Sequence, residues 1–200
     1  MNYFVKLGLV LLLITAIASG ILAFVNGLTS EKIKANKLVA EQEARKEVLS
    51  EASRFEKQTV TLPAVETEPN PLKNKVEAGP RQFIYYLGYN DESAIVGYTF
   101  VASQYGYSSE VKTMVGVNLD MSIARIKVIE QSETPGLGAN AATADFQGRF
   151  VDMNQEQLQV DKDGGAIKSL TGATITSRAV TNSIAEGMKI LADAMTEEGK

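Results

Sequence analysis

The chain has 200 residues, a net charge of −4, and no cysteine, histidine or tryptophan. Without Cys and His it lacks the usual ligands of zinc, haem, copper and iron–sulfur clusters, and it lacks the groups for thiol or histidine-based nucleophilic catalysis. Any redox or group-transfer function must therefore come from an organic cofactor, and the interspersed charges give no nucleic-acid footprint.

The first expected element is a membrane-spanning helix within residues 1–28. No charged residue occurs between Lys6 and Glu31, and residues 7–25 are almost wholly apolar. About 20 apolar residues are enough to cross the hydrocarbon core of a bilayer. A cleaved signal peptide is the alternative, because residues 16–18 fit an A-x-A cleavage site. We favour a retained span because the apolar run continues past that site.

Residues 29–80 are expected to form an amphipathic helix followed by a linker. Ser30 is a suitable N-cap, and apolar residues recur at roughly helical spacing from Glu31 to about Lys57. A stalk or a helix that packs on a partner explains this pattern, and a coiled coil is the weaker alternative because the heptads are irregular. Residues 59–80 are polar and rich in proline, which predicts a linker.

Residues 81–200 are expected to form one α+β domain with an antiparallel sheet and a long C-terminal helix. Apolar, aromatic and β-branched residues predict strands at 83–87, 95–101, 111–119 and 123–129, and residues 141–150 are expected to hold a short helix. A final helix over residues 177–195 carries one apolar stripe that should face the core: Val180, Ile184, Met188, Leu191 and Met195.

A glycine-bearing turn, E-T-P-G-L-G, follows the last predicted strand. Pro135 fixes one φ angle, while Gly136 and Gly138 allow a positive φ or a close approach of the backbone to a flat ligand. Leu137 is expected at the tip of the turn. An ordinary tight turn without a ligand is the alternative that this motif alone leaves open.

The second motif, S-L-T-G-A-T-I-T-S at residues 169–177, precedes the final helix. The first N–H groups of a helix have no partner inside the helix, and the helix dipole favours an anion there, so the motif is a candidate phosphate site. A simple helix cap is the alternative, but a cap needs one hydroxyl and this stretch has several.

Together the two motifs resemble the FMN-binding domain of the G subunit of the Rnf complex, a domain that also occurs in the C subunit of the sodium-translocating NADH:quinone oxidoreductase. The resemblance extends over the whole chain and implies FMN bound covalently by a phosphoester to Thr176. It implies a flavin transferase that uses FAD and Mg²⁺ and releases AMP. Including the neighbours of both motifs, the expected cofactor-binding residues are Thr176, Thr174, Ser177, Thr171, Gly172, Ala173, Glu133, Thr134, Gly136, Leu137 and Lys168.

Two positions depart from the family pattern. The family often has a histidine where this chain has Gln131, and an acidic residue where this chain has Lys168. Neither departure removes an acceptor threonine. We include Lys168 as a candidate contact of the flavin phosphate, with an exposed surface lysine as the alternative.

Lys6 on one side of the apolar run and Lys32, Lys34 and Lys37 on the other leave the orientation open by the positive-inside rule. The resemblance implies a single-pass subunit of the cell (inner) membrane with its C-terminal domain outside the cytoplasm. It would pass electrons among other Rnf-type membrane and redox subunits and would have no independent catalytic site. The alternatives are the quinone-reductase subunit, a stand-alone flavinylated extracytoplasmic reductase, and a membrane scaffold without a cofactor.

Overall fold

The computed structural model describes residues 3–62 and 81–198. The chain divides into two compact units, Met1–Gln42 and Glu43–Lys200. The elements are the helix α1 (Tyr3–Val48), the strands β1 (Arg54–Leu62), β2 (Arg81–Tyr89), β3 (Ile95–Tyr105), β4 (Glu110–Asn118) and β5 (Ile123–Glu130), the short helices η1 (Gly138–Ala142), α2 (Ala144–Gln147), η2 (Gly148–Phe150), η3 (Gln155–Gln157) and η4 (Asp161–Asp163), and the helix α3 (Thr174–Glu198).

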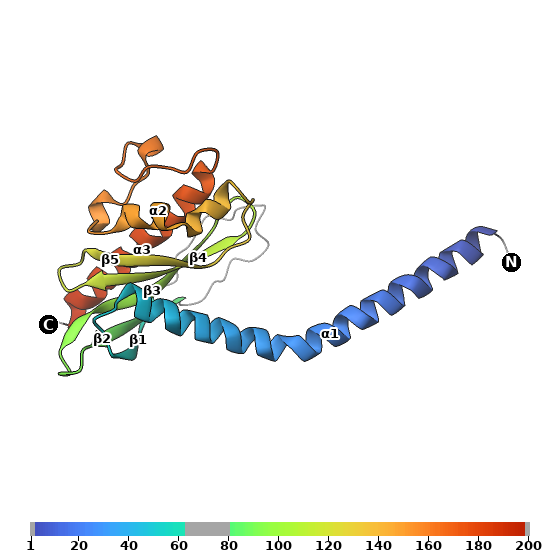
Figure 1. Ribbon diagram of the computed structural model, residues 1–200, viewed down its shortest axis with the longest axis horizontal. Coiled ribbons are helices and arrows are strands. Elements are labelled where there is room, and N and C mark those ends of the chain that lie inside the picture. Colours follow the sequence, from blue (N-terminus) through green and yellow to red (C-terminus); the bar gives the residue numbers. More distant parts are fainter. Residues whose placement is uncertain (1–2, 63–80, 199–200) are drawn as a thin grey trace. The chain divides into compact units, whose positions relative to one another are not determined.

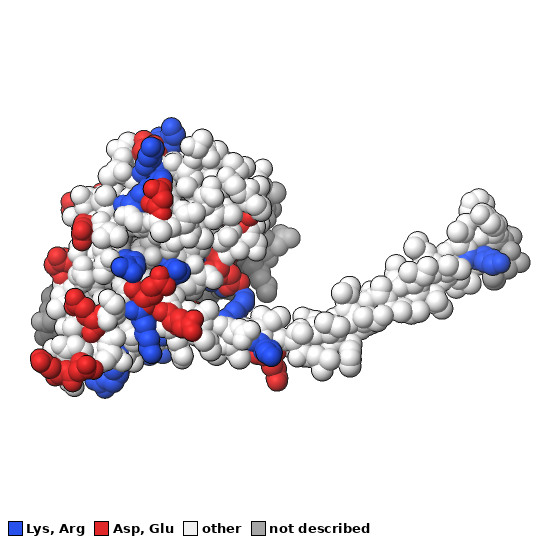
Figure 2. Space-filling view, in the orientation of Figure 1, with Lys and Arg blue, Asp and Glu red and all other residues white. Residues whose placement is uncertain are grey.

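The helix α1 contains a stretch that is long and apolar enough to cross a membrane. Between Lys6 and Glu31 it carries no charged side chain, and its surface there is correspondingly free of charge (Figure 2). The prediction that a new helix starts at Ser30 was wrong, because α1 continues through this position and the Ser30 hydroxyl donates to the carbonyl of Gly27 at 3.3 Å. The predicted helix end near Lys57 was also wrong, because α1 ends at Val48.

The strand β1 occupies a segment that was expected to be shared between the amphipathic helix and the linker. It pairs antiparallel with β2, so residues 54–62 belong to the sheet. Phe55, Val60 and Leu62 are half-buried on this strand. The alternation of apolar and polar residues in β1 is short and is interrupted by polar residues. The charge-rich helical pattern before it was therefore extended into this segment in the prediction. Most of the predicted linker, residues 63–80, lies outside the described residues.

The five strands form an antiparallel sheet in sequence order, β1-β2-β3-β4-β5. The strands predicted from alternation in the second unit are confirmed as β2 to β5, with bounds that differ by a few residues. Each strand therefore pairs with its neighbour in the chain, which short connections favour. The predicted short helical region is confirmed as η1, α2 and η2.

One face of the sheet is covered by α3 (Figure 1). The predicted stripe is confirmed, since Val180, Ile184, Met188 and Leu191 are fully buried and Met195 is partly buried. They pack with sheet residues such as Phe100 and Val115 in one core. The α+β fold is thus established by a single amphipathic helix on one face of the sheet.

The other face of the sheet receives the end of α1. Ala44 and Val48 pack against Met114 of β4. Gly116 of β4 makes this close approach possible, because a Cβ atom there would lie 2.3 Å from the carbonyl oxygen of Val48. Residues 43–48 of α1 therefore belong to the core of the second unit.

The close contact between Gly116 and Val48 leads to a prediction about stability. Gly116→Ala should lower the free energy of unfolding by about 1–3 kcal/mol, because the added methyl group meets backbone atoms that cannot turn away. Gly148→Ala is the matched control, since a Cβ there meets nothing within 4 Å. Urea unfolding of the full-length chain in detergent measures both, and equal midpoints would contradict this account of the interface.

Candidate functional site

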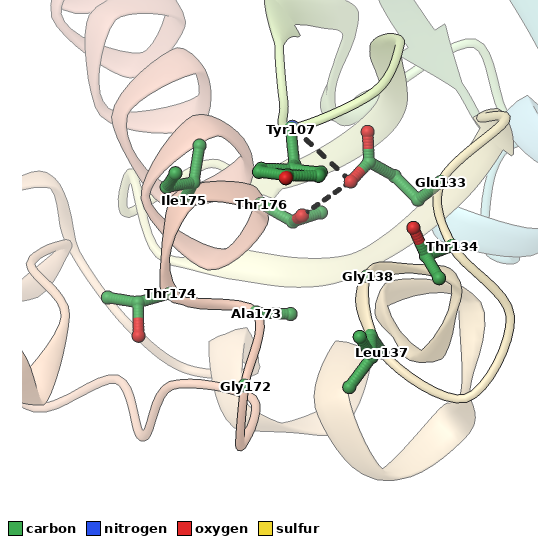
Figure 3. A pocket seen from close by; sticks show the side chains of 10 residues that line it. All are labelled: Tyr107, Glu133, Thr134, Leu137, Gly138, Gly172, Ala173, Thr174, Ile175 and Thr176. Carbon is green, nitrogen blue, oxygen red and sulfur yellow. Dashed lines mark hydrogen bonds between the residues drawn. The ribbon is translucent and has the colours of Figure 1, made fainter.

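A cavity of about 590 Å³ lies in the second unit, where three segments meet. The segments are the β3–β4 turn, the turn after β5, and the start of α3 (Figure 3). The cavity volume falls within the ~300–1,000 Å³ typical of small-molecule sites. The lining residues are Tyr107, Glu133, Thr134, Leu137, Gly138, Gly172, Ala173, Thr174, Ile175 and Thr176.

The turn after β5 forms one wall. Gly136 has a φ of +77°, a conformation that favours glycine. The N–H groups of Leu137 and Ala139 both donate to the carbonyl of Thr134, at 3.1 and 3.2 Å, and this closes the turn. As predicted, Leu137 is presented at the tip, where 43% of its surface is exposed.

The loop before α3 forms the opposite wall and is fixed by Ser177. The N–H of Leu170 donates to the Ser177 hydroxyl oxygen at 2.9 Å, and the hydroxyl donates to the carbonyl of Ala173 at 3.0 Å. This side chain is fully buried. The Ser177 hydroxyl is thus committed to holding the loop, and it does not line the cavity.

The start of α3 provides a site for an anion. The first bond into the helix runs from the N–H of Ser177 to the carbonyl of Ala173 at 3.0 Å. The N–H groups of Thr174, Ile175 and Thr176 precede this bond and have no carbonyl four residues earlier within the helix. They supply donors and the positive end of the helix dipole to the cavity.

Glu133 and Thr176 form the floor of the cavity. Both side chains are buried, and the Thr176 hydroxyl donates to Oε2 of Glu133 at 2.6 Å. The N–H of Tyr107 donates to Oε2 at 3.3 Å, and the N–H groups of Ser108 and Ser109 donate to Oε1 at 2.9 and 3.0 Å. The Ser109 hydroxyl also donates to Oε1 at 3.4 Å. One carboxylate therefore joins all three segments.

This environment controls the charge of Glu133. Burial raises the pKa of its carboxyl group, but hydrogen bonds from the Thr176 hydroxyl and from the N–H groups of Ser108, Ser109 and Tyr107 outweigh burial and leave the pKa below its ordinary value. The floor of the cavity is therefore a carboxylate at neutral pH.

The rim of the cavity is apolar. Tyr107, Leu137 and Ile175 are exposed over 68%, 43% and 52% of their surfaces. Figure 3 shows the Tyr107 ring beside Ile175, with Leu137 across the opening in this view. Exposed large apolar side chains around a cavity mark a ligand or partner site. The arrangement suits a molecule with a flat apolar part on the rim and an anionic group at the helix start.

The structure brings most of the predicted site residues to this cavity. Seven of them line it: Glu133, Thr134, Leu137, Gly172, Ala173, Thr174 and Thr176. Thr171, Gly136, Ser177 and Lys168 do not line it. The Lys168 side chain is exposed, and only its carbonyl makes a described contact, accepting a hydrogen bond from Arg149.

Three lining residues were not among the expected cofactor-binding residues. Gly138 had been named only for a possible close approach of the backbone to a ligand, and Ile175 lies inside the second motif and could have been selected from it. Tyr107 lies on the β3–β4 turn, and no local pattern places this turn beside residue 133. Its contribution depends on the pairing of β3, β4 and β5.

The fold and the cavity define a class of protein: a cofactor-binding domain on a chain that has, among the described residues, one helix suited to crossing a membrane. Two family models match the chain. The FMN-binding domain model matches residues 106–189, which include the whole cavity, and the RnfG N-terminal region model matches residues 3–48.

Named relatives extend over most of the chain. The G subunit of the ion-translocating oxidoreductase complex of Methanosarcina acetivorans is 33% identical over 90% of this chain and 89% of the relative. The G subunit of the Na⁺-translocating ferredoxin:NAD⁺ oxidoreductase complex of Acetobacterium woodii is 35% identical over 90% of this chain and 87% of the relative. The chain therefore belongs to the RnfG family, the G subunits of ion-translocating oxidoreductase complexes.

The fold agrees with solved structures. NqrC of Shewanella oneidensis has a TM-score of 0.55 and 16% identity, covering 74% of this chain and 91% of that structure. The C subunit of the Na⁺-translocating NADH-quinone reductase of Parabacteroides distasonis has a TM-score of 0.53 and 18% identity, covering 77% of this chain and 91% of that structure.

Family membership makes the chain an FMN-binding electron-transfer subunit.

The role of Ser177 can be tested by unfolding. Ser177→Ala should cost about 1–3 kcal/mol, because it leaves the buried N–H of Leu170 without an acceptor. Ser108→Ala removes an exposed hydroxyl and should stay within about 0.5 kcal/mol of wild type. Urea unfolding of the full-length chain compares them. A Ser177→Ala midpoint equal to that of Ser108→Ala would contradict the role assigned to this hydroxyl.

Proposed function

We propose that the chain is the flavin-carrying subunit of an Rnf-type complex that couples electron transfer between ferredoxin and NAD⁺ to ion movement. The observation that carries this proposal is the cavity of the FMN-binding domain, with a helix start for a phosphate and an apolar rim for a ring. Relatives are named as Na⁺-translocating and proton-translocating ferredoxin:NAD⁺ oxidoreductase subunits, so the family does not fix one coupling ion.

We further propose that FMN is held covalently, by a phosphoester to a threonine in the first turn of α3. The family resemblance implies Thr176. Its hydroxyl is buried and already donates to the Glu133 carboxylate at 2.6 Å. A phosphoester on this oxygen would replace the shared proton by an anionic phosphate next to a carboxylate, which is electrostatically unfavourable.

Thr174 is the better acceptor on geometric grounds. It is the first residue of α3, is only half-buried, and lines the cavity. In Figure 3 its hydroxyl points away from the Glu133 carboxylate. A phosphate on this oxygen would lie at the helix start, near N–H groups that have no acceptor within the helix. We therefore prefer Thr174 and retain Thr176 as the alternative.

Attachment requires a flavin transferase that uses FAD and Mg²⁺. One bond forms between the threonine oxygen and the phosphorus of the FMN phosphate, and the pyrophosphate bond of FAD breaks. AMP leaves with the bonding electron pair, and the threonine proton passes to a base of the transferase. The chain itself supplies no such base beside Thr174 among the residues that line the cavity.

When bound, FMN supplies one- and two-electron redox chemistry. The residues of the chain would bind and orient it: the N–H groups at the start of α3 would hold the phosphate, and Leu137, Ile175 and Tyr107 would shield one part of the ring from water. No substrate proton has to be moved, so the cavity needs no acid–base pair. The apolar span of α1 carries no charged residue between Lys6 and Glu31 and offers no ion pathway by itself.

The attachment is tested by denaturing gel electrophoresis after co-expression with a transferase. Wild type should give a fluorescent band under ultraviolet light, Thr174→Ala should give none, and Thr176→Ala should give a weaker band, because it keeps the acceptor but loses the hydrogen bond to Glu133. Lys168→Ala should retain the band and the flavin midpoint potential, since this side chain does not line the cavity.

Two other outcomes have clear meanings. Loss of fluorescence in Thr176→Ala with retention in Thr174→Ala would return the acceptor to Thr176. A dark band in wild type, with an active transferase shown on a second substrate protein, would contradict covalent flavin and leave non-covalent FMN or a scaffold role.

We also propose that the second unit lies outside the cytoplasm. The chain has no cysteine, so one introduced cysteine is the sole thiol. Asp91→Cys, at an exposed position of the β2–β3 turn, should react with a membrane-impermeant maleimide in cells with a permeabilised outer envelope. Tyr3→Cys should react only after the membrane is broken. The reverse labelling pattern would place the flavin domain in the cytoplasm.

A further inference from the structure

The Glu133 carboxylate is buried without a cation. Its described partners are the hydroxyls of Thr176 and Ser109 and the N–H groups of Tyr107, Ser108 and Ser109. No ion pair with Lys or Arg is formed by Glu133 in the part of the chain that the structure describes. A buried charge is tolerated only when hydrogen bonds replace its hydration. Here all of those bonds come from the segments that make the cavity.

Two glycines leave the space that this carboxylate fills. A Cβ atom on Gly106 would lie 2.8 Å from Oε1 of Glu133, and one on Gly138 would lie 2.5 Å from Oε2. The Gly138 position would also lie 2.7 Å from the Thr176 hydroxyl oxygen. The chain is therefore shaped around the carboxylate from two sides, independently of the hydrogen bonds.

We propose that Glu133 is the positioning residue of the flavin site: its ionised carboxylate holds the β3–β4 turn and the first turn of α3 against its own turn, and flavin is accepted only while these walls are joined. The inference rests on the proposed function for the identity of the ligand. The proposal gives Thr176 a role other than flavin attachment. Among the described contacts, the Thr176 hydroxyl is the only hydrogen-bond donor that α3 contributes to the Glu133 carboxylate.

The substitution Glu133→Gln isolates the charge. A glutamine amide has one oxygen, and its NH₂ group would face N–H donors from Tyr107 or from Ser108 and Ser109. Part of the network would therefore lose its acceptor although the size of the side chain is unchanged. Thr176→Val removes only the contact from α3, and Thr176→Ser restores the hydroxyl.

The network also predicts a pH dependence with a definite sign. The folded-state pKa of Glu133 lies below its ordinary value, so its contribution to stability is full above the unfolded pKa and is lost as the pH falls through the folded pKa. Among the described residues that line the cavity, Tyr107 is the other titratable side chain. Glu133→Gln should remove this contribution at every pH.

The test uses the full-length chain in detergent, with and without co-expressed transferase. Flavin content per chain should fall roughly 5- to 30-fold in Glu133→Gln and Thr176→Val and recover in Thr176→Ser. In the flavin-free chain, the melting temperature of Glu133→Gln should lie below that of wild type at about pH 7, and the two should converge only as the pH falls below about 4, through the lowered folded-state pKa of Glu133. Glu156→Gln, at an exposed position, is the matched control and should follow wild type in both measurements.

The outcomes separate this inference from the proposed function. The positioning role would be overturned if Glu133→Gln contained as much flavin as wild type. It would also be overturned if the difference in melting temperature between the two proteins did not shrink on acidification. Absence of flavin from wild type would instead contradict the proposed function, while the pH-dependent melting of the flavin-free chain would still test the network. If Glu133→Gln fails to fold, the melting temperature of the flavin-free Thr176→Val chain, compared with that of Thr176→Ser, decides, because this measurement does not depend on which threonine carries flavin.

Discussion

The hydrogen bond between Thr176 and Glu133 joins residues 43 positions apart, and the site depends on it. The same carboxylate accepts hydrogen bonds from backbone N–H groups of the β3–β4 turn, so one buried charge connects the three segments around the cavity. Each donor alone is a modest interaction, but removing the shared acceptor leaves several donors unsatisfied at once. The geometry of the site is therefore cooperative, whereas its individual turns are local.

The rest of the second unit holds these turns at fixed positions. The stripe from Val180 to Leu191 binds α3 to the sheet, and this fixes where the first turn of the helix points. The pairing of β4 with β3 and β5 places the β3–β4 turn beside the turn after β5. On the opposite face, residues 43–48 of α1 fill the space above Gly116. Core packing and site geometry are thus two consequences of one arrangement of α3 on the sheet.

The sequence predicted what depends on local pattern. Alternation identified the strands from β2 to β5, and helical spacing identified the buried stripe of α3. The prediction was wrong at the junction of α1 and β1. The charged helical pattern before Val48 was extended into the short strand β1, because the partner strand β2 follows only after a long connection in the sequence. In the site, both glycine motifs were found, but the partners of their hydroxyls were not. Ser177 bonds within its own loop and Thr176 bonds to Glu133, and only the folded pairing decides between these uses.

The charge of the cavity gives a physical reason for the covalent attachment that we propose. None of the residues that line it within the described part of the chain is Lys or Arg, and its floor is a carboxylate. An anionic phosphate would meet only the N–H groups and the dipole of α3, which stabilise a charge by about 0.3–1 kcal/mol at exposed sites. Non-covalent FMN would then be held weakly, and the proposed phosphoester would remove this weakness by keeping the ring at high effective concentration. Such a tether would prevent loss of the flavin without requiring a cation at the phosphate, which suits a carrier that exchanges electrons with several partners.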